Sequence, residues 1–221
     1  MYSVTKIQTF NDCKNRYKLS YIDKVEQSVN EAFIKGRKIH KSLETLDESD
    51  DFVKYFFNTN LGLKYKDVII NAQKEVRIGL DFKNGKIIPC TYSKECLFGG
   101  IIDVLYNNII LDYKTGRYKE KQDYIQLMYY AVWLFLNSDY DSVTVSYLYV
   151  EHDKENTTTL YRRDLNALLK HLVSNIINIR KYEENPVEVY NPSWKCEWCS
   201  VRKHCKMNLD NLEKLVNDTR I

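Results

Sequence analysis

Residues 98–116 read FGGIIDVLYNNIILDYKTG, and this stretch predicts the centre of the fold. Two apolar runs flank Asn107-Asn108, and asparagine tolerates the positive φ that a two-residue hairpin turn requires. With these asparagines as the loop, we expect Asp103 to lie opposite Asp112 on the neighbouring strand. Lys114 follows Asp112 by two residues and therefore projects from the same face. The sequence thus predicts a hairpin that brings two carboxylates and a lysine together.

Such a group of side chains has a defined chemistry. Like charges opposed on neighbouring strands destabilise a sheet, and buried carboxylates need a counter-charge. Mg²⁺ or Mn²⁺, which prefer oxygen ligands, supply that charge and support phosphodiester hydrolysis, in which a lysine orients the attacking water and offsets developing charge. The alternative is an ordinary hairpin end in which Lys114 forms a salt bridge with the two aspartates.

The flanking sequence alternates between helical and extended patterns. Helices are expected at 3–17, at about 30–46, at 51–66, at 122–137 and at about 163–182. The β-branched runs Val68-Ile69-Ile70 and Glu75-Val76-Arg77-Ile78 predict the start of a sheet, and Ser142–Val150 predicts a further strand. This order predicts an α/β (α+β sandwich) fold with a central mixed sheet flanked by helices.

The length of 221 residues and the hydrophobic content of 44% fit a single domain. Within it we expect an N-terminal helical part (1–66), a core (67–185) and a cysteine-rich tail (186–221) that packs back on the N-terminus. The net charge of +3 indicates no class of partner. The sequence shows no apolar run of membrane-spanning length and no signal-peptide pattern, so we expect a cytoplasmic protein with no membrane partner. It also lacks a phosphate-binding loop, so a helicase would be a separate chain.

Several motifs resemble one enzyme family. Gly100-Ile101-Ile102-Asp103 and Asp112-Tyr113-Lys114-Thr115-Gly116 resemble the G-x-x-D and D-x-K-T-G motifs of the RecB-like PD-(D/E)XK nucleases. Gly36-x-x-x-His40 resembles the family's helical histidine motif, and Gln126-x-x-x-Tyr130 resembles its Q-x-x-x-Y helix, whose two side chains share a face. The resemblance spans about residues 3–205 and implies a restriction-endonuclease-like core.

The resemblance assigns a role to each matched residue. It implies that the metal ligands are His40, Asp103, Asp112 and the backbone carbonyl of Tyr113. It also implies that Lys114 is the catalytic lysine and that Gln126 and Tyr130 order water or DNA. Glu75 is a candidate for the additional acid that some members carry on the first strand. Taken singly, His40, Gln126 and Tyr130 are also compatible with ordinary helix packing.

The cysteines predict a second metal centre. Cys196, Cys199 and Cys205 lie at metal-ligand spacing, one thiolate short of a filled site. Members that resemble the CRISPR-associated exonucleases and AddB carry one early and three late cysteines, which implies that Cys13 is the fourth ligand of a [4Fe–4S] cluster.

Two departures leave a structural Zn²⁺ open. Lys14 follows Cys13 where proline is common, and Val201 stands where an aromatic residue is usual. The fourth zinc ligand would then be His204 or Cys13. Cys90 and Cys96 bracket an expected loop before the hairpin, and the sequence assigns them no role.

We therefore expect a metal-dependent DNA exonuclease that acts at DNA ends and prefers single strands. Basic residues near the expected site, including Arg37, Arg117 and Lys119, are candidates to contact phosphates. The resemblance suggests CRISPR spacer processing or a phage relative, with CRISPR integrase proteins or a helicase as partners. The alternatives are a recombination or repair nuclease beside a separate helicase, a non-catalytic DNA-binding scaffold on the same fold, and a zinc-tailed adaptor with an accidental D-x-K motif.

Overall fold

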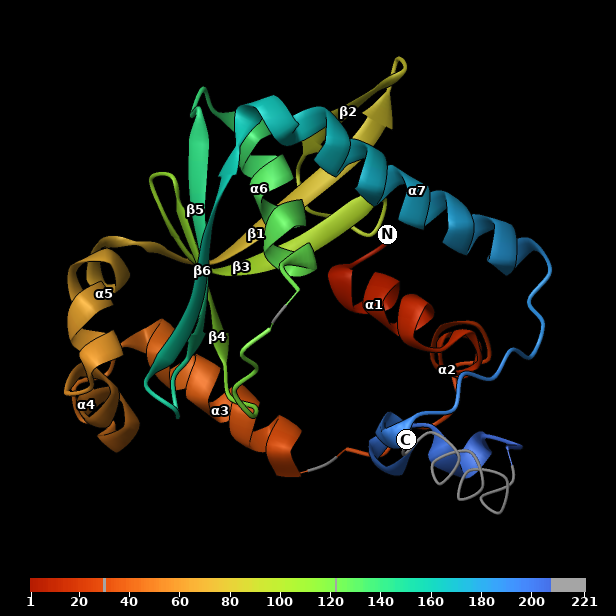
Figure 1. The fold of residues 1–221 in the computed structure, drawn as a ribbon, viewed down its shortest axis with the longest axis horizontal. Coiled ribbons are helices and arrows are strands. Elements are labelled where there is room, and N and C mark those ends of the chain that lie inside the picture. The colour runs from red at the N-terminus through yellow and green to blue at the C-terminus, as the bar shows by residue number, and fades with distance from the viewer. Residues whose placement is uncertain (30, 122, 208–221) are drawn as a thin grey trace. The chain divides into compact units, whose positions relative to one another are not determined.

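The computed structural model describes residues 1–29, 31–121 and 123–207. Within these residues, six strands form a sheet of order β2-β1-β3-β4-β5-β6 (Figure 1). Strands β4 and β5 are parallel and the other neighbours are antiparallel, so the sheet is mixed, as predicted. The strands are β1 (Gln73–Lys83), β2 (Lys86–Cys90), β3 (Phe98–Tyr106), β4 (Ile109–Lys114), β5 (Ser142–Tyr149) and β6 (Lys154–Tyr161).

Seven α-helices accompany the sheet in the described part of the chain. They are α1 (Val4–Asp12), α2 (Lys14–Tyr17), α3 (Glu31–Thr45), α4 (Asp51–Phe57), α5 (Asn60–Asn71), α6 (Ile125–Asn137) and α7 (Leu165–Glu184). A π-helical turn follows α2, and short 3₁₀ turns lie before α7 and in the tail. The predicted fold class is confirmed. None of the described helices combines the length and apolar composition that a membrane span requires.

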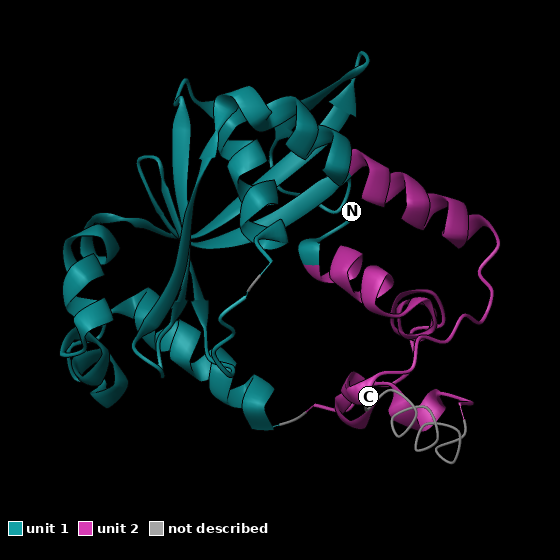
Figure 2. Ribbon diagram, viewed as in Figure 1, with its two compact units in different colours: residues 1–4, 30–172 teal, residues 5–29, 173–221 magenta. Residues whose placement is uncertain are grey.

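The chain divides into two compact units (Figure 2). The sheet unit comprises residues 1–4 and 30–172 and contains all six strands. The terminal unit comprises residues 5–29 and 173–221, so it joins helices from the N-terminal region to the end of α7 and the tail. The single-domain organisation with three sequential parts stays a prediction.

The hydrophobic cores of the sheet unit lie between its helices and its strands. One core joins residues of α3, α4 and α5 to buried residues of β3, β4 and β5, among them Leu43, Phe56, Ile69, Val104 and Leu148. Helix α6 packs on the other side of the sheet through buried aromatic residues (Figure 1). For example, Tyr129 makes an edge contact with Phe98 of β3. The sheet is therefore covered by helices on both faces, and its central strands are buried.

The expected strand at Val68-Ile69-Ile70 is wrong, because these residues end α5. Thr59 caps the helix by accepting a hydrogen bond from the amide of Gly62 (3.0 Å). Leu61, Tyr65 and Ile69, spaced by four, are all buried on one face. Ile69 completes this apolar stripe, so tertiary packing overrides the local β propensity.

The expected single helix at 3–17 is interrupted at Cys13. This residue is extended (φ −160°, ψ 112°) and its Sγ accepts a hydrogen bond from the amide of Arg16 at 3.4 Å, which caps α2. The expected helix at 122–137 is confirmed from Ile125 onward, and Gln122 lies outside the described residues.

Candidate active site

The hairpin of β3 and β4 has the predicted register near its turn. Tyr106 pairs with Ile109, Leu105 with Ile110, and Val104 with Leu111, and Asn107 has a positive φ of 51°. The predicted pairing of Asp103 with Asp112 is not formed, because the ladder ends one pair earlier.

The carboxylate of Asp103 explains where the strands separate. In a regular ladder the amide of Tyr113 would bond to the carbonyl of Ile102 on the opposite strand. Instead, that amide donates to Asp103 Oδ2 at 2.7 Å. The buried side chain of Asp103 therefore takes the place of a backbone acceptor. This hydrogen bond fixes the carboxylate between the two strands.

Glu75 of β1 lies on the other side of Asp103. The β1–β3 register pairs Lys74 with Val104 and Val76 with Ile102, which leaves Glu75 opposite Asp103 as the break in the ladder. Glu75 has a φ of 50°, in the left-handed region that side chains other than glycine seldom adopt. Such strain is typical of functional positions. The break brings a second carboxylate to Asp103.

His40 of α3 completes this group. Its Nδ1 lies 3.4 Å from Asp103 Oδ2. His40, Glu75 and Asp103 each offer one ligand atom, and the three atoms lie within 4.8 Å of one another. Hence α3, β1 and β3 together place three possible metal ligands around one point. We call His40, Glu75 and Asp103 the metal-ligand group.

The electrostatics of this group favour a cation. Burial and then the charge of Asp103 raise the pKa of Glu75. Burial acts to lower the pKa of His40, but the hydrogen bond and charge of Asp103 outweigh it, so that pKa is raised. A divalent cation bound here would replace the repulsion between the Glu75 and Asp103 carboxylates with attraction.

Asp112, Lys114 and the polar residues of α6 form a second group. Lys114 Nζ lies 2.5 Å from Asp112 Oδ2 and donates to Gln126 Oε1 at 2.9 Å. Gln126 Nε2 donates to Asp112 Oδ1 at 2.5 Å and to the Tyr130 hydroxyl at 3.1 Å. One turn of α6 thus orients the carboxylate and the ammonium of β4.

Asp112 is almost fully buried, and its environment also fits a cation. Burial raises its pKa to about 6, although the charge of Lys114 acts to lower it. Its Oδ2 accepts no hydrogen bond of ordinary angular geometry from the described residues, so the ion pair with Lys114 is its main interaction. An unsatisfied buried carboxylate oxygen is compatible with a bound cation or water.

The metal-ligand group opens into a cleft of about 660 Å³, whose lining includes Phe33, Gly36, Arg37, His40, Glu75, Asp103 and Thr115. Gly36 allows α3 to lie close to Thr115, the residue that follows β4, because a Cβ at residue 36 would come within 2.9 Å of Thr115 Oγ1. Phe33 is 57% exposed, and the Arg37 guanidinium lies 5.9 Å from its ring centroid. An aromatic ring and a positively charged guanidinium group thus border the cleft.

The residues predicted from the sequence divide into these two groups. His40, Glu75 and Asp103 are brought together, with the backbone of Tyr113 beside them, and Asp112, Lys114, Gln126 and Tyr130 form the second group. Asp112 lies outside the metal-ligand group. Arg37 lines the cleft, whereas Arg117 and Lys119 are exposed in the segment after β4 and are absent from its lining.

Sequence reasoning missed two residues of the site. Phe33 lies one turn before Arg37 on an exposed helix face, and the Lys114 ammonium lies 4.6 Å from the ring centroid of Tyr147 on β5. The local sequence does not distinguish Tyr147 from the other tyrosines among the 18 of the chain. Tyr147 reaches the site because the parallel pairing of β4 with β5 places it beside Asp112. An exposed aromatic residue within a basic helix was a usable signal for Phe33.

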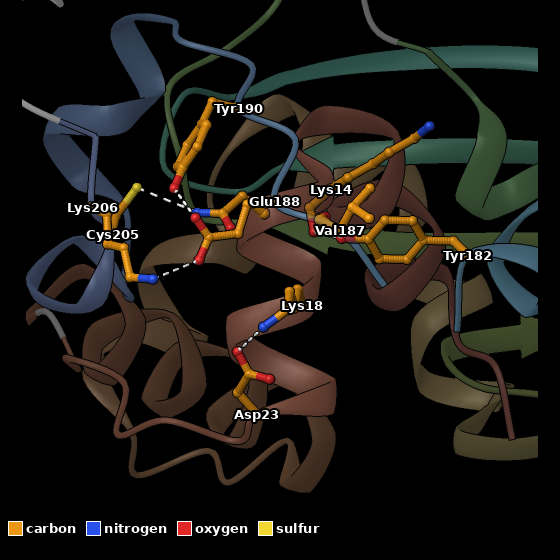
Figure 3. Close-up of polar contacts among 10 residues, drawn as sticks. Lys14, Lys18, Asp23, Tyr182, Val187, Glu188, Tyr190, Cys205 and Lys206 are labelled. Carbon is orange, nitrogen blue, oxygen red and sulfur yellow. Dashed lines mark hydrogen bonds and ion pairs between the residues drawn. The ribbon is translucent and has the colours of Figure 1, made fainter. Parts of the chain in front are cut away.

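The terminal unit holds a separate cysteine site. Cys13, Cys196, Cys199 and Cys205 all line one cavity of about 120 Å³. Asn15 Nδ2 donates to Cys205 Sγ at 3.4 Å, and Glu188 links the adjoining Lys206 to Tyr190 (Figure 3). Burial raises the pKa of Cys199. Four thiols around one cavity are a donor set that fits a metal centre.

Comparison with known proteins adds a family to this geometry. Residues 1–206 match the model of the PD-(D/E)XK nuclease superfamily. A "putative exonuclease" from Eubacterium rectale has a similar structure, with a TM-score of 0.53 and 14% identity over 93% of this chain and 88% of that one. A protein designated SSO0001 gives a TM-score of 0.45 and 17% identity over 93% and 85% of the two chains. No curated protein matches the chain.

Proposed function

Because the chain belongs to the PD-(D/E)XK nuclease superfamily, we propose that it is a metal-dependent deoxyribonuclease that hydrolyses phosphodiester bonds at DNA ends. The observation that carries this proposal is the convergence of His40, Glu75 and Asp103, whose ligand atoms lie within 4.8 Å of one another on the wall of a cleft. A binding scaffold without chemistry has no need of two opposed carboxylates and a strained backbone at this point.

In this proposal the metal-ligand group holds a divalent cation, Mg²⁺ or Mn²⁺, with Asp112 as a further carboxylate at its edge. The bound cation would supply Lewis-acid polarisation of the phosphate and a more acidic water. Asp103 is held rigid by the Tyr113 amide, and this preorganisation reduces the cost of assembling the ligands.

Lys114 is the residue that we assign to the reacting phosphate. Its ammonium lies between Asp112 and Gln126, so two acceptors fix its position on β4. A cation held beside the scissile phosphate stabilises the charge that develops in the transition state, and the same ammonium orients a water for attack. Gln126 acts through Lys114 and Asp112 and is a positioning residue.

Gln126→Leu tests this positioning role. Losing the amide hydrogen bonds to Lys114 and Asp112 frees these two side chains, so we expect about a 10-fold decrease in kcat with little change in KM. Measurement of the cleavage rate against DNA concentration separates the two constants. Gln8→Leu, a change of the same type on α1 and outside the candidate site, serves as the matched control. A Gln126→Leu enzyme with wild-type kcat would remove Gln126 from the account.

We further propose that the substrate is single-stranded. The exposed ring of Phe33 beside Arg37 offers a stacking surface for an unpaired base, and such stacking is worth about 1–3 kcal/mol per base. Bases of an intact duplex are already stacked and cannot use it.

Phe33→Ala is therefore expected to weaken binding of single-stranded DNA by about 10-fold and to leave duplex binding almost unchanged. Fluorescence anisotropy with labelled oligonucleotides, in the presence of Ca²⁺ to suppress cleavage, measures both affinities. Phe82→Ala removes another exposed ring that does not line the cleft and is the matched control. Equal losses on both substrates would contradict a stacking role.

Digestion of linear and circular single-stranded DNA tests the exonuclease assignment. With Mg²⁺ or Mn²⁺, the linear strand labelled at one end should be degraded while the circle remains intact. Cleavage of both forms would show an endonuclease. Failure of the wild-type protein to cleave either form would favour the DNA-binding scaffold instead.

We propose that the terminal unit carries a [4Fe–4S] cluster, with Cys13, Cys196, Cys199 and Cys205 as ligands. All four cysteines line one cavity of the terminal unit, and one early with three late cysteines is the pattern of the iron–sulfur proteins that the sequence resembles. This cysteine pattern supports a function in CRISPR spacer processing, or the corresponding function of a phage relative, and we propose that the protein acts in the cytoplasm. Its partners would then be integrase proteins or a helicase.

A further inference from the structure

Two cysteines that belong to neither metal site lie in contact in the sheet unit. Cys90 is the last residue of β2, and Cys96 lies just before β3. Their sulfurs are 2.6 Å apart. Cys96 is 4% exposed and Cys90 is partly exposed, so the pair has a buried and an accessible member.

Gly79 of β1 creates the space in which the two sulfurs meet. Its neighbours in the sheet are Cys90 on one side and Gly99 on the other. A Cβ at residue 79 would come within 2.8 Å of both sulfurs and 2.9 Å of the Cys90 carbonyl oxygen. Only glycine lets both thiols lie against this strand. The pair therefore occupies a site that three adjacent segments form together.

The surroundings of the pair hold the thiols in place. The Cys96 thiol donates to the Thr91 carbonyl oxygen at 3.1 Å, and the Cys96 amide bonds to the Ser93 carbonyl oxygen at 3.3 Å. Burial acts to raise the pKa of Cys96, but hydrogen bonds from Cys90 and Ser93 outweigh it and lower that pKa. Among the described residues, no further cysteine, histidine or carboxylate joins the pair in a metal-ligand group.

We propose that Cys90 and Cys96 form a reversible disulfide that closes in the presence of a low-molecular-weight disulfide such as oxidised glutathione. One protein thiolate attacks the small disulfide, which breaks its S–S bond, forms a mixed disulfide and releases one small thiol. The second protein thiolate then attacks the mixed disulfide and releases the other small thiol. Two protein thiols are oxidised and one small disulfide is reduced to two thiols, so atoms and electrons balance.

The disulfide closes the segment that leads into β3. Because β3 carries Asp103, this loop precedes a strand of the candidate active site. Closing a ring of about seven residues restricts the unfolded chain, and we expect the melting temperature to rise by about 5 °C. In a reducing compartment such bonds are transient and often redox-sensing, which fits a partly exposed pair.

Peptide mapping of the full chain tests the proposal without reference to nuclease activity. The protein is equilibrated in glutathione buffers of increasing oxidised fraction, quenched with acid, alkylated and digested with trypsin. Cleavage after Lys94 separates residues 87–94 from residues 95–114, so a disulfide between Cys90 and Cys96 links two peptides. We expect the linked species to become the main form and to disappear on reduction. Glutathione or alkyl groups on both cysteines, with no linked peptide, would overturn the proposal.

Two variants sharpen the test. Cys96→Ser should leave Cys90 as a mixed disulfide with glutathione, because no resolving thiol remains. Gly79→Ala keeps both thiols but displaces them, so its linked fraction should fall several-fold at the same glutathione ratio. Cys199 and Cys205 lie in the terminal unit and provide an internal reference in the same digests. A wild-type linked fraction in Gly79→Ala would show that the Gly79 site does not control pairing.

Discussion

Replacing Asp103 with asparagine is expected to lower the rate of DNA cleavage by about 10³-fold or more. Asp103 Oδ2 accepts the Tyr113 amide at 2.7 Å and faces His40 Nδ1 at 3.4 Å, so this carboxylate joins both halves of the hairpin to α3. Asparagine keeps the size and can still accept a hydrogen bond, but it removes the charge that would hold the cation. The single-turnover rate on end-labelled DNA with saturating Mg²⁺ measures the loss.

The control for this change is Asp139→Asn, which neutralises an exposed carboxylate in the same unit. It should cleave at the wild-type rate. Calorimetric titration with Mn²⁺ should also show weaker binding to the Asp103→Asn protein, and its melting temperature should stay close to that of wild type. An Asp103→Asn enzyme with near-wild-type cleavage would remove Asp103 from the metal-ligand group.

Cys196→Ser is expected to have the largest effect on stability. A cluster that links Cys13 to three cysteines of the tail would couple metal binding to folding of the terminal unit, and losing one ligand would release both segments. We expect a fall in melting temperature of about 5 °C or more, together with loss of iron and of visible absorbance in anaerobically purified protein. Cleavage by the folded fraction should decrease much less than in Asp103→Asn.

Cys90→Ser is the matched control for this second prediction, because Cys90 lies outside the cysteine cavity. Under reducing conditions it should keep the wild-type iron content and melting temperature. One equivalent of zinc and no iron in the wild-type protein would replace the iron–sulfur assignment with structural zinc. Wild-type melting behaviour in Cys196→Ser would contradict a structural metal of either kind.

The sequence predicts the centre of the sheet better than its edges. Residues 98–116 combine strong apolar alternation with an Asn-Asn turn, and the register near the turn follows from these local signals. The edge strands β2 and β6 were not predicted. Strand β2 contains Pro89, and β6 is polar and rich in threonine, since an edge strand buries only part of its surface. Because their hydrophobic patterning is weak, neither edge strand could be predicted from the sequence.

The site shows the same division between local and tertiary information. Family motifs predict His40, Asp103, Asp112, Lys114, Gln126 and Tyr130, and the structure brings these residues into two adjoining groups. The separation of β3 from β4 could not be predicted, because it depends on the Asp103 carboxylate replacing a backbone acceptor. The left-handed backbone of Glu75 likewise arises only once β1 and β3 are paired. Motifs thus identify residues, and tertiary contacts decide their partners.

Cleavage of end-labelled single-stranded DNA by anaerobically purified wild type and Asp112→Asn, with Mg²⁺, Mn²⁺ or EDTA, tests the central claim most directly. The account predicts rapid loss of the labelled strand by wild type with either metal, no loss with EDTA, and no detectable loss by Asp112→Asn under any condition. Cleavage by wild type in EDTA, or equal cleavage by Asp112→Asn, would contradict a metal-dependent nuclease built on this hairpin.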